Sequence, residues 1–229
     1  MKKFIIFLLI LVVAILVVAQ FLLPNFVKSQ LETEIKSKLN PDATTLVVES
    51  TPAAKLLLGD VDTLRGELEG VTLGHLTFSD IHLDVQDMQF NPISLLVDHK
   101  MEISEIGKGE IEGTVTESDL QTFMEKNIKG LQIKEVDINS NGINVIGTVD
   151  MGFIKGTANI KGKLEIKNNS LVFSPDRFEI NGSSIGGLTS AVLKQIVIYD
   201  FTSFPIPVHA DRIETINGEL HLYVSPIAK

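Results

Sequence analysis

The fold of this chain is decided by residues 55–90, KLLLGDVDTLRGELEGVTLGHLTFSDIHLDVQDMQF. Apolar and polar residues alternate here in short runs, a pattern typical of strands with one buried and one solvated face. The alternating apolar residues are Val71, Leu73, Leu76, Phe78, Ile81, Leu83 and Val85. Short connections favour antiparallel hairpins, and the internal glycines favour bulges and bends. The segment therefore predicts a curled sheet with an apolar concave face, and it contains no acid–base pair or nucleophile.

The composition limits the classes of function. Of the 229 residues, 44% are hydrophobic, which is ample for a sizeable core. Cysteine is absent, which excludes thiolate metal sites, redox motifs and disulfides. The formal net charge of −9 argues against nucleic-acid binding and against broad adsorption to anionic headgroups. No motif calls for a cofactor, and none is expected.

The N-terminal segment is long and apolar enough to cross a bilayer. Phe4–Leu23 contains a single polar residue, Gln20. A helix of this length spans roughly 30 Å, the thickness of the hydrocarbon core. Lys2 and Lys3 precede it, so the positive-inside rule places the N-terminus in the cytoplasm and the rest of the chain outside.

A second interpretation of the N-terminal segment is a cleaved signal peptide. Val17-Val18-Ala19 offers small residues to a signal peptidase, although apolar residues continue to Leu23. Both interpretations give an exported domain. The expected organisation is a transmembrane signal anchor over residues 1–23 and one extracytoplasmic domain over 24–229, single-pass in the cytoplasmic membrane or secreted after cleavage.

A second helix is expected after Pro24, which suits a first helical turn, and it should stop at Asn40-Pro41. Its apolar stripe is Val27, Leu31, Ile35 and Leu39. The stripe fits either a helix on the membrane surface or a helix that packs on the sheet.

The remaining pattern is strand-rich with short helices. Strands are expected at 44–49, 102–115 with breaks at Gly107 and Gly109, 131–138, 143–149, 158–166, 171–180, 208–215 and 220–224. Pro175 is expected at an edge or bulge. Helices are expected at 118–128, opened by a capping box at Ser118, and at 184–196. The predicted class is α+β, with a long curved antiparallel sheet wrapped around helices.

Several stretches together resemble a known family. They are LLLGDVDTLRGELEGVTLGHLTFSDIHLDVQDMQFNPISLL, GEIEGTVTESDLQTFM, LVFSPDRFEINGS and SFPIPVHADRIETINGELHLYVS. Their order and spacing are similar to the bacterial LmeA-like phospholipid-binding family, itself similar to the tubular lipid-binding proteins. The resemblance covers about residues 44–226. It implies an envelope protein whose curved sheet wraps over a long helix and holds a lipid, with no catalytic set.

A lipid cavity and a dry core have the same sequence pattern, and only this resemblance favours the cavity. A phospholipid carries roughly 30 methylenes, and exposing them costs about 24 kcal/mol, so carriage requires a continuous apolar sleeve. The residues expected to line it are Leu83, Val85, Met88, Phe90, Leu120, Phe123, Met124, Ile128, Val145, Val149, Leu188, Val192 and Ile196. The leading hypothesis is a membrane-anchored lipid-binding protein, and the alternative is a structural or interaction module with a filled core.

An esterase is the third hypothesis. Gly182-Ser183-Ser184-Ile185-Gly186 matches G-x-S-x-G between an expected strand and helix. Asp200 or Asp211 could then orient His209 or His221, in the chain order serine, acid, histidine. The nucleophile elbow belongs to a mostly parallel sheet, however, whereas tight antiparallel turns dominate this chain. No catalytic residue is assigned.

Several short motifs contain residue types that bind metals or phosphate. His82-x-Asp84 and His209-x-Asp211 each give two ligand-type side chains on one strand face, and a metal needs at least a third. Asp60-x-Asp62 starts like a calcium loop but continues with Leu64. No metal site is predicted. The lysines at 161, 163 and 167 suit either lipid phosphates or protection of a strand edge.

Overall fold

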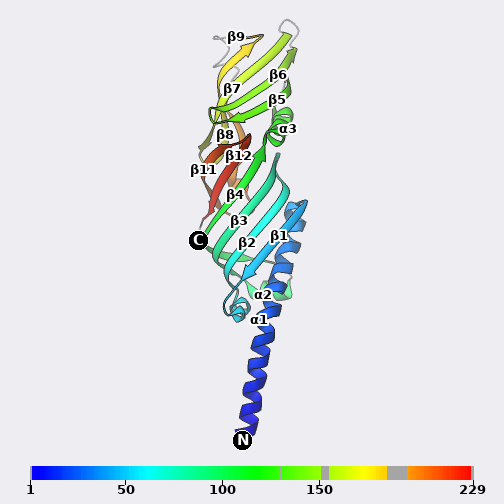
Figure 1. Ribbon diagram of the computed structural model, residues 1–229, viewed down its shortest axis with the longest axis vertical. Helices are drawn as coiled ribbons and strands as arrows, with labels where there is room; N and C mark the ends of the chain where they lie inside the picture. The colour runs from blue at the N-terminus through cyan, green and yellow to red at the C-terminus, as the bar shows by residue number, and fades with distance from the viewer. Residues whose placement is uncertain (1, 99, 129, 151–154, 185–194, 228–229) are drawn as a thin grey trace. The chain divides into compact units, whose positions relative to one another are not determined.

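The structure is a computed structural model that describes residues 2–98, 100–128, 130–150, 155–184 and 195–227 (Figure 1). Two compact units are present. Unit 1 comprises Met1–Leu68, His82–Glu110 and Ile227–Lys229, and unit 2 comprises Glu69–Ile81 and Ile111–Pro226.

Two sheets contain the described strands. The first has the order β1 (Ala43–Glu49), β2 (Asp60–Leu73), β3 (Leu76–Phe90), β4 (Ile103–Thr116), β12 (Glu219–Pro226) and β11 (Val208–Ile216). The second has the order β10 (Ile196–Asp200), β8 (Ser170–Ile180), β7 (Lys155–Lys167), β6 (Gly142–Asp150) and β5 (Leu131–Asn139), with β9 (Ser183–Ser184) paired to β8. The helices are α1 (Lys2–Leu39), η1 (Ala53–Leu58), α2 (Pro92–Val97), α3 (Glu117–Asn127) and η2 (Phe201–Ser203). The predicted α+β class with extensive antiparallel sheet is confirmed.

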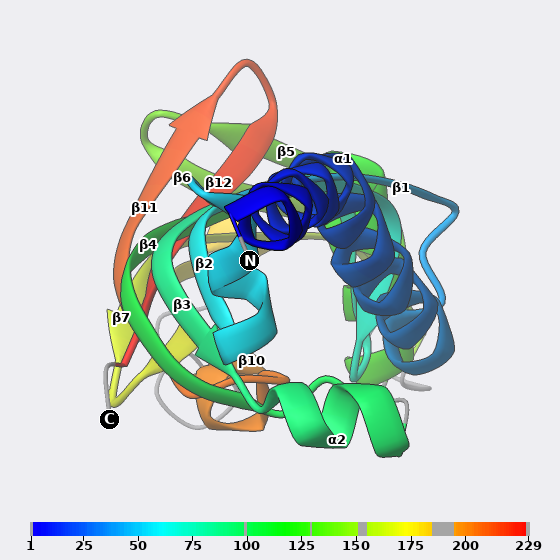
Figure 2. The same ribbon diagram turned by 90° about the horizontal axis from the view of Figure 1, so that it is seen from below.

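In unit 1, α1 is one continuous helix, so the prediction that a new helix begins at Pro24 is wrong. Proline at an interior position removes one backbone hydrogen bond. Packing in the following turns holds the helix together, since Val27 and Leu31 are buried where α1 meets β1 and η1. The stripe on this part of α1 therefore packs on the folded unit, as the second sequence interpretation proposed. Figure 2 shows α1 and α2 beside the curved strands β2 and β3.

The β2–β3 hairpin reproduces the alternation expected from the sequence, with two changes of phase. On β3 the buried residues change from Phe78 to Ile81, and from Val85 to Met88. Asp87 adopts a left-handed φ of 54° beside the second change, and on β2 Gly70 has a φ of 65° beside the change from Leu68 to Val71. An extra residue at such points keeps the apolar side chains on one face of a bending sheet.

The β4 strand differs from the prediction, because it continues through Gly107 and Gly109 without a break. At Gly107 an added Cβ would lie 2.8 Å from Asp87 Cβ, so the glycine permits close approach of the neighbouring strand. The glycine is thus a packing feature within the strand and does not end it.

In unit 2, α3 covers Glu117–Asn127, and its cap lies two residues before the predicted one. Its N-cap is Thr116, whose hydroxyl accepts a bond from Asp119 N while the Asp119 carboxylate accepts one from Thr116 N. The capping box predicted at Ser118 is therefore wrong by two residues. Ile128 lies at the C-cap in an extended conformation, beyond the helix on which it was placed.

The second sheet is built from tight hairpins, as the Asn-Gly and Asn-Asn turns predicted. Pro175 lies at a register shift between β7 and β8, where Lys161 pairs with Arg177 and Gly162 pairs with Pro175. The bulge expected at Pro175 is confirmed. The ends of the helix predicted at 184–196 are wrong, because Ser184 belongs to β9 and Ile196 begins β10. Residues 185–194 lie outside the described residues.

Candidate functional site

Unit 1 contributes an apolar interior surface built on β3. Val85, Met88 and Phe90 are buried on it, and Leu83 is half-buried. Leu83 lies over Gly66 with Leu46 of β1, because a Cβ added to Gly66 would come within 3.1 Å of Leu83 Cγ and 2.5 Å of Leu46 Cδ2. The structure therefore brings these four predicted residues together on one face of the sheet, and Leu46 of strand β1 extends that face beyond β2.

Unit 2 contributes a separate apolar interior. Leu120, Phe123 and Met124 are buried on α3, which packs on β5. Val145 and Val149 are buried on β6. Met124 has no exposed surface, so a lipid chain that contacted it would have to displace packed side chains.

The other predicted lining residues are distributed differently. Ile128 and Ile196 are half-buried, at the end of α3 and the start of β10. Leu188 and Val192 lie outside the described residues. The described positions are divided between the two units, and their role in lipid contact stays a prediction.

Sequence reasoning missed an aromatic cluster in the interior of unit 2. Tyr199 packs edge-on against Phe78 and Phe201, with ring centroids 6.0 and 5.1 Å apart. Burial, together with the charge of Asp200, raises the pKa of Tyr199 to about 12. Its phenol therefore stays neutral at physiological pH. The run of β-branched and aromatic residues Ile196–Tyr199 is the sequence signal that could have identified this strand.

A family model described as LmeA-like phospholipid-binding matches residues 18–225, nearly the whole chain. The chain belongs to the LmeA-like phospholipid-binding family. The resemblance found in the sequence is confirmed. Neither a curated protein nor a solved structure matches the chain. Membership in a phospholipid-binding family supports lipid as a ligand.

The side chains considered for an esterase have other arrangements in this LmeA-like protein. Ser184 is exposed on the two-residue strand β9. His209 Nδ1 lies 3.1 Å from Asp211 Oδ1, while Ser225 donates to the other oxygen of Asp211. The Asp211 carboxylate thus contacts both the His209 ring and the Ser225 hydroxyl. The Asp200 side chain caps η2 by accepting bonds from Thr202.

A further polar network lies on β4 and β12. His221 Nδ1 is 2.7 Å from Glu112 Oε1, and the Tyr223 hydroxyl donates to the same oxygen at 3.1 Å. Burial and this carboxylate raise the pKa of Tyr223. The guanidinium of Arg212 lies over the Tyr223 ring, 3.6 Å from its centroid. The network joins neighbouring strands on the face opposite the apolar residues.

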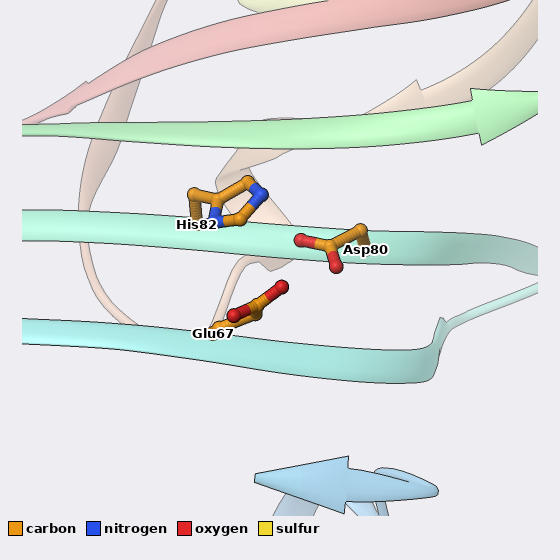
Figure 3. A group of neighbouring side chains, drawn as sticks. All are labelled: Glu67, Asp80 and His82. Carbon is orange, nitrogen blue, oxygen red and sulfur yellow. The ribbon is translucent and has the colours of Figure 1, made fainter. Parts of the chain in front are cut away.

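The β2–β3 hairpin places three potential metal ligands together, namely Glu67, Asp80 and His82 (Figure 3). One ligand atom from each lies within 4.8 Å of the others. Asp84, which lies two residues after His82 on the same strand, contacts Arg65 at 3.3 Å. Sequence spacing could not reveal Glu67, which comes from the neighbouring strand. Glu67 and His82 are exposed, and the group offers three ligands where a closed structural zinc site uses four.

The three lysines do not form a uniform basic edge. Lys161 lines a polar cleft of about 380 Å³ together with Arg177, Asp137 and Asp176. Lys167 pairs with Glu165, whose pKa is lowered by bonds from Lys167 and Ser174. Acidic groups therefore accompany the lysines, and contact with a lipid phosphate remains a prediction.

Proposed function

We propose that this protein is a membrane-anchored extracytoplasmic protein that holds, presents or transfers a phospholipid in an apolar cavity. The observation that carries the proposal is the match to a phospholipid-binding family over residues 18–225. The orientation outside the cytoplasm follows from Lys2 and Lys3 ahead of the apolar helix.

The described structure supports this proposal in two ways. The curved strands carry continuous apolar residues on one face, which is the surface that acyl chains require. In addition, α1 is the one described helix long and apolar enough to span a membrane, and its apolar run is exposed. Together they would hold a lipid-binding surface beside a source of lipid.

Within this proposal, Leu83 is the residue on β3 through which a bound chain gains access. It is half-buried, whereas Val85, Met88 and Phe90 on the same face are buried. A half-buried apolar side chain can exchange contact with solvent for contact with ligand without a rearrangement of the core.

Photo-crosslinking tests the proposal with the full-length chain. The protein would be reconstituted into vesicles that contain a phospholipid with a diazirine on an acyl chain, and crosslinked peptides would be mapped by mass spectrometry. We expect crosslinks on β3 as well as on α1, which serves as the internal positive control. Crosslinks confined to α1 in folded protein would contradict lipid binding by the sheet and favour the filled structural module.

Two matched variants sharpen this experiment, because each adds one carboxylate to β3. Leu83→Glu places the charge on the apolar face, where it should abolish the β3 crosslinks. Gln86→Glu places it on the exposed face and should leave them unchanged. Equal crosslinking of the two variants would show that lipid does not reach the apolar face.

A further inference from the structure

Two short helices of unit 1 expose an unusual amount of apolar surface. Outside α1, the four most exposed large apolar side chains of the described residues are Leu58, Ile93, Val97 and Leu96, at 75, 70, 70 and 61%. All four lie on η1 or α2, and Leu57 of η1 is also exposed. Contiguous exposed apolar surface of this kind marks a site of interaction.

The two helices are fixed to each other and have well-packed inner sides. The backbone of Gly59, which ends η1, accepts a bond from Phe90 N at 2.9 Å, and an added Cβ there would lie 3.1 Å from Pro92 of α2. Ala53 and Leu56 are buried on the inner side of η1, and Leu95 is buried on that of α2. The exposed leucines, isoleucine and valine are therefore additional to the core of the unit.

A hydrogen bond sets the level of η1 along α1. The Ala53 N–H donates to Gln20 Oε1 at 2.9 Å. Gln20 lies three residues before the end of the apolar run at Leu23, which corresponds to about 5 Å along a helix. In Figure 1, η1 and α2 lie beside α1. If α1 spans the bilayer, η1 begins at the boundary between hydrocarbon and headgroups.

We infer that Leu57, Leu58, Ile93, Leu96 and Val97 form an apolar platform that inserts into the outer surface of the same bilayer. The inference rests on the part of the proposed function in which α1 spans the membrane. The occupant is lipid, because the Gln20–Ala53 bond holds η1 beside the end of the exposed apolar run of α1. Short apolar elements at this depth are typical of interfacial membrane contact.

The sequence provides a direct probe, since the chain contains no tryptophan. Single tryptophans would be introduced at Leu58 and Leu96 of the platform. Val13→Trp in the middle of the apolar run reports insertion of α1. Val47→Trp is the matched control, because Val47 is an exposed apolar residue of unit 1 on β1, beside the part of α1 that follows the apolar run (Figure 1).

Each full-length variant would be reconstituted into phosphatidylcholine vesicles with bromine at a shallow or a deep position of the acyl chains. We expect shallow bromine to remove most emission of Leu58→Trp and Leu96→Trp, deep bromine to quench Val13→Trp, and neither to quench Val47→Trp. Quenching at Val13 alone would overturn the platform and leave the anchor intact. Emission at the platform that shifts to the blue without quenching would also overturn it, because a protein surface or a second copy would then cover these residues.

The two proposals fail separately in these measurements. Absence of quenching at Leu58, Leu96 and Val13 would overturn the membrane contact of α1 and of the platform together. Crosslinks on β3 report lipid binding by the sheet, and they do not depend on whether Leu58 and Leu96 meet the bilayer.

Discussion

At the scale of single residues, close backbone approach explains several glycines that composition alone leaves unexplained. Gly113 of β4 is buried, and an added Cβ would lie 2.7 Å from Cδ1 of Phe78. The Phe78 ring in turn packs against Tyr199. The missing side chain at Gly113 thus leaves room on β4 for the Phe78 ring of the aromatic cluster in unit 2.

Gly113→Ala should therefore destabilise the protein by about 1–3 kcal/mol, because the Phe78 ring has to move within a packed cluster. Gly74→Asn is the control, since Gly74 has a positive φ that asparagine tolerates and no atoms near an added Cβ. Urea denaturation monitored by circular dichroism measures both. Equal stability of Gly113→Ala and the parent would show that the ring is free to move.

A second residue-scale feature is the contact of Asp62 with Lys55 and the Thr51 N–H, at 2.7 Å each. The bond from Lys55, followed by the bond from Thr51, lowers the pKa of Asp62 below its ordinary value of 3.8. A lowered carboxyl pKa stabilises the fold fully above that ordinary value, and the stabilisation is lost as pH falls through the lowered pKa.

Asp62→Asn should therefore be less stable than the parent at neutral pH, by less than ~1 kcal/mol because the pair is partly exposed to solvent. The difference should disappear in strong acid, where the parent carboxyl is also neutral. Denaturation midpoints of both proteins over a pH series give the comparison. A difference that persisted unchanged into strong acid would exclude the ionic contribution.

At the scale of elements, the strands were more predictable than the helices. Alternation and turn residues located the hairpins, including the Asn217-Gly218 turn between β11 and β12, because both signals are local. The start of α3 was missed, since its cap Thr116 is also the last residue of β4. The local preference of Pro24 to begin a helix predicted a break in α1. The burial of Val27 and Leu31 depends on residues that are distant in sequence, and it outweighs that preference.

The candidate site was predictable to a smaller extent for the same reason. The apolar face of β3 follows from alternation. The position of Leu46 next to Leu83 depends on how the strands pair. Likewise, His82 on β3 has Asp80 of the same strand and Glu67 of β2 as neighbours. Sequence gives the face on which a side chain lies, whereas tertiary contacts decide what it meets.

The cap of α3 gives a prediction at this scale. Thr116→Ala removes the hydroxyl that accepts the Asp119 N–H bond and should cost about 0.5–2 kcal/mol. Thr122→Ala, at an exposed interior position of the same helix, should be neutral or slightly stabilising because alanine favours helix. Thermal unfolding of the two variants distinguishes them, and the reverse order of stability would refute the assigned helix start.

At the scale of the whole molecule, the proposed topology makes everything after Leu23 accessible from outside the cytoplasm. The chain has two described units, and strands β2, β3 and β4 each contribute residues to both. Both units therefore lie on the same side of the membrane. If the N-terminus were outside the cell, the entire lipid-binding region would lie in the cytoplasm.

A protease added to intact protoplasts of an expressing bacterium should digest an epitope fused after Lys229. A cytoplasmic marker protein should survive the same treatment and serves as the control for intact membranes. Membrane fractionation of the undigested chain should retain the epitope in the pellet if α1 is an anchor. Protection of the epitope until detergent is added would refute the extracytoplasmic orientation.

The uninterrupted helix α1 also limits how far the protein can travel with a lipid. Only three residues lie between Leu23, at the end of the apolar run, and the packed residue Val27, which is about 6 Å further along the helix. No flexible linker lies between them. A retained anchor would thus confine the domain to diffusion within the plane of the membrane. Delivery to a distant acceptor would then depend on the acceptor coming to the membrane surface, and its rate would vary with the density of both proteins in that surface.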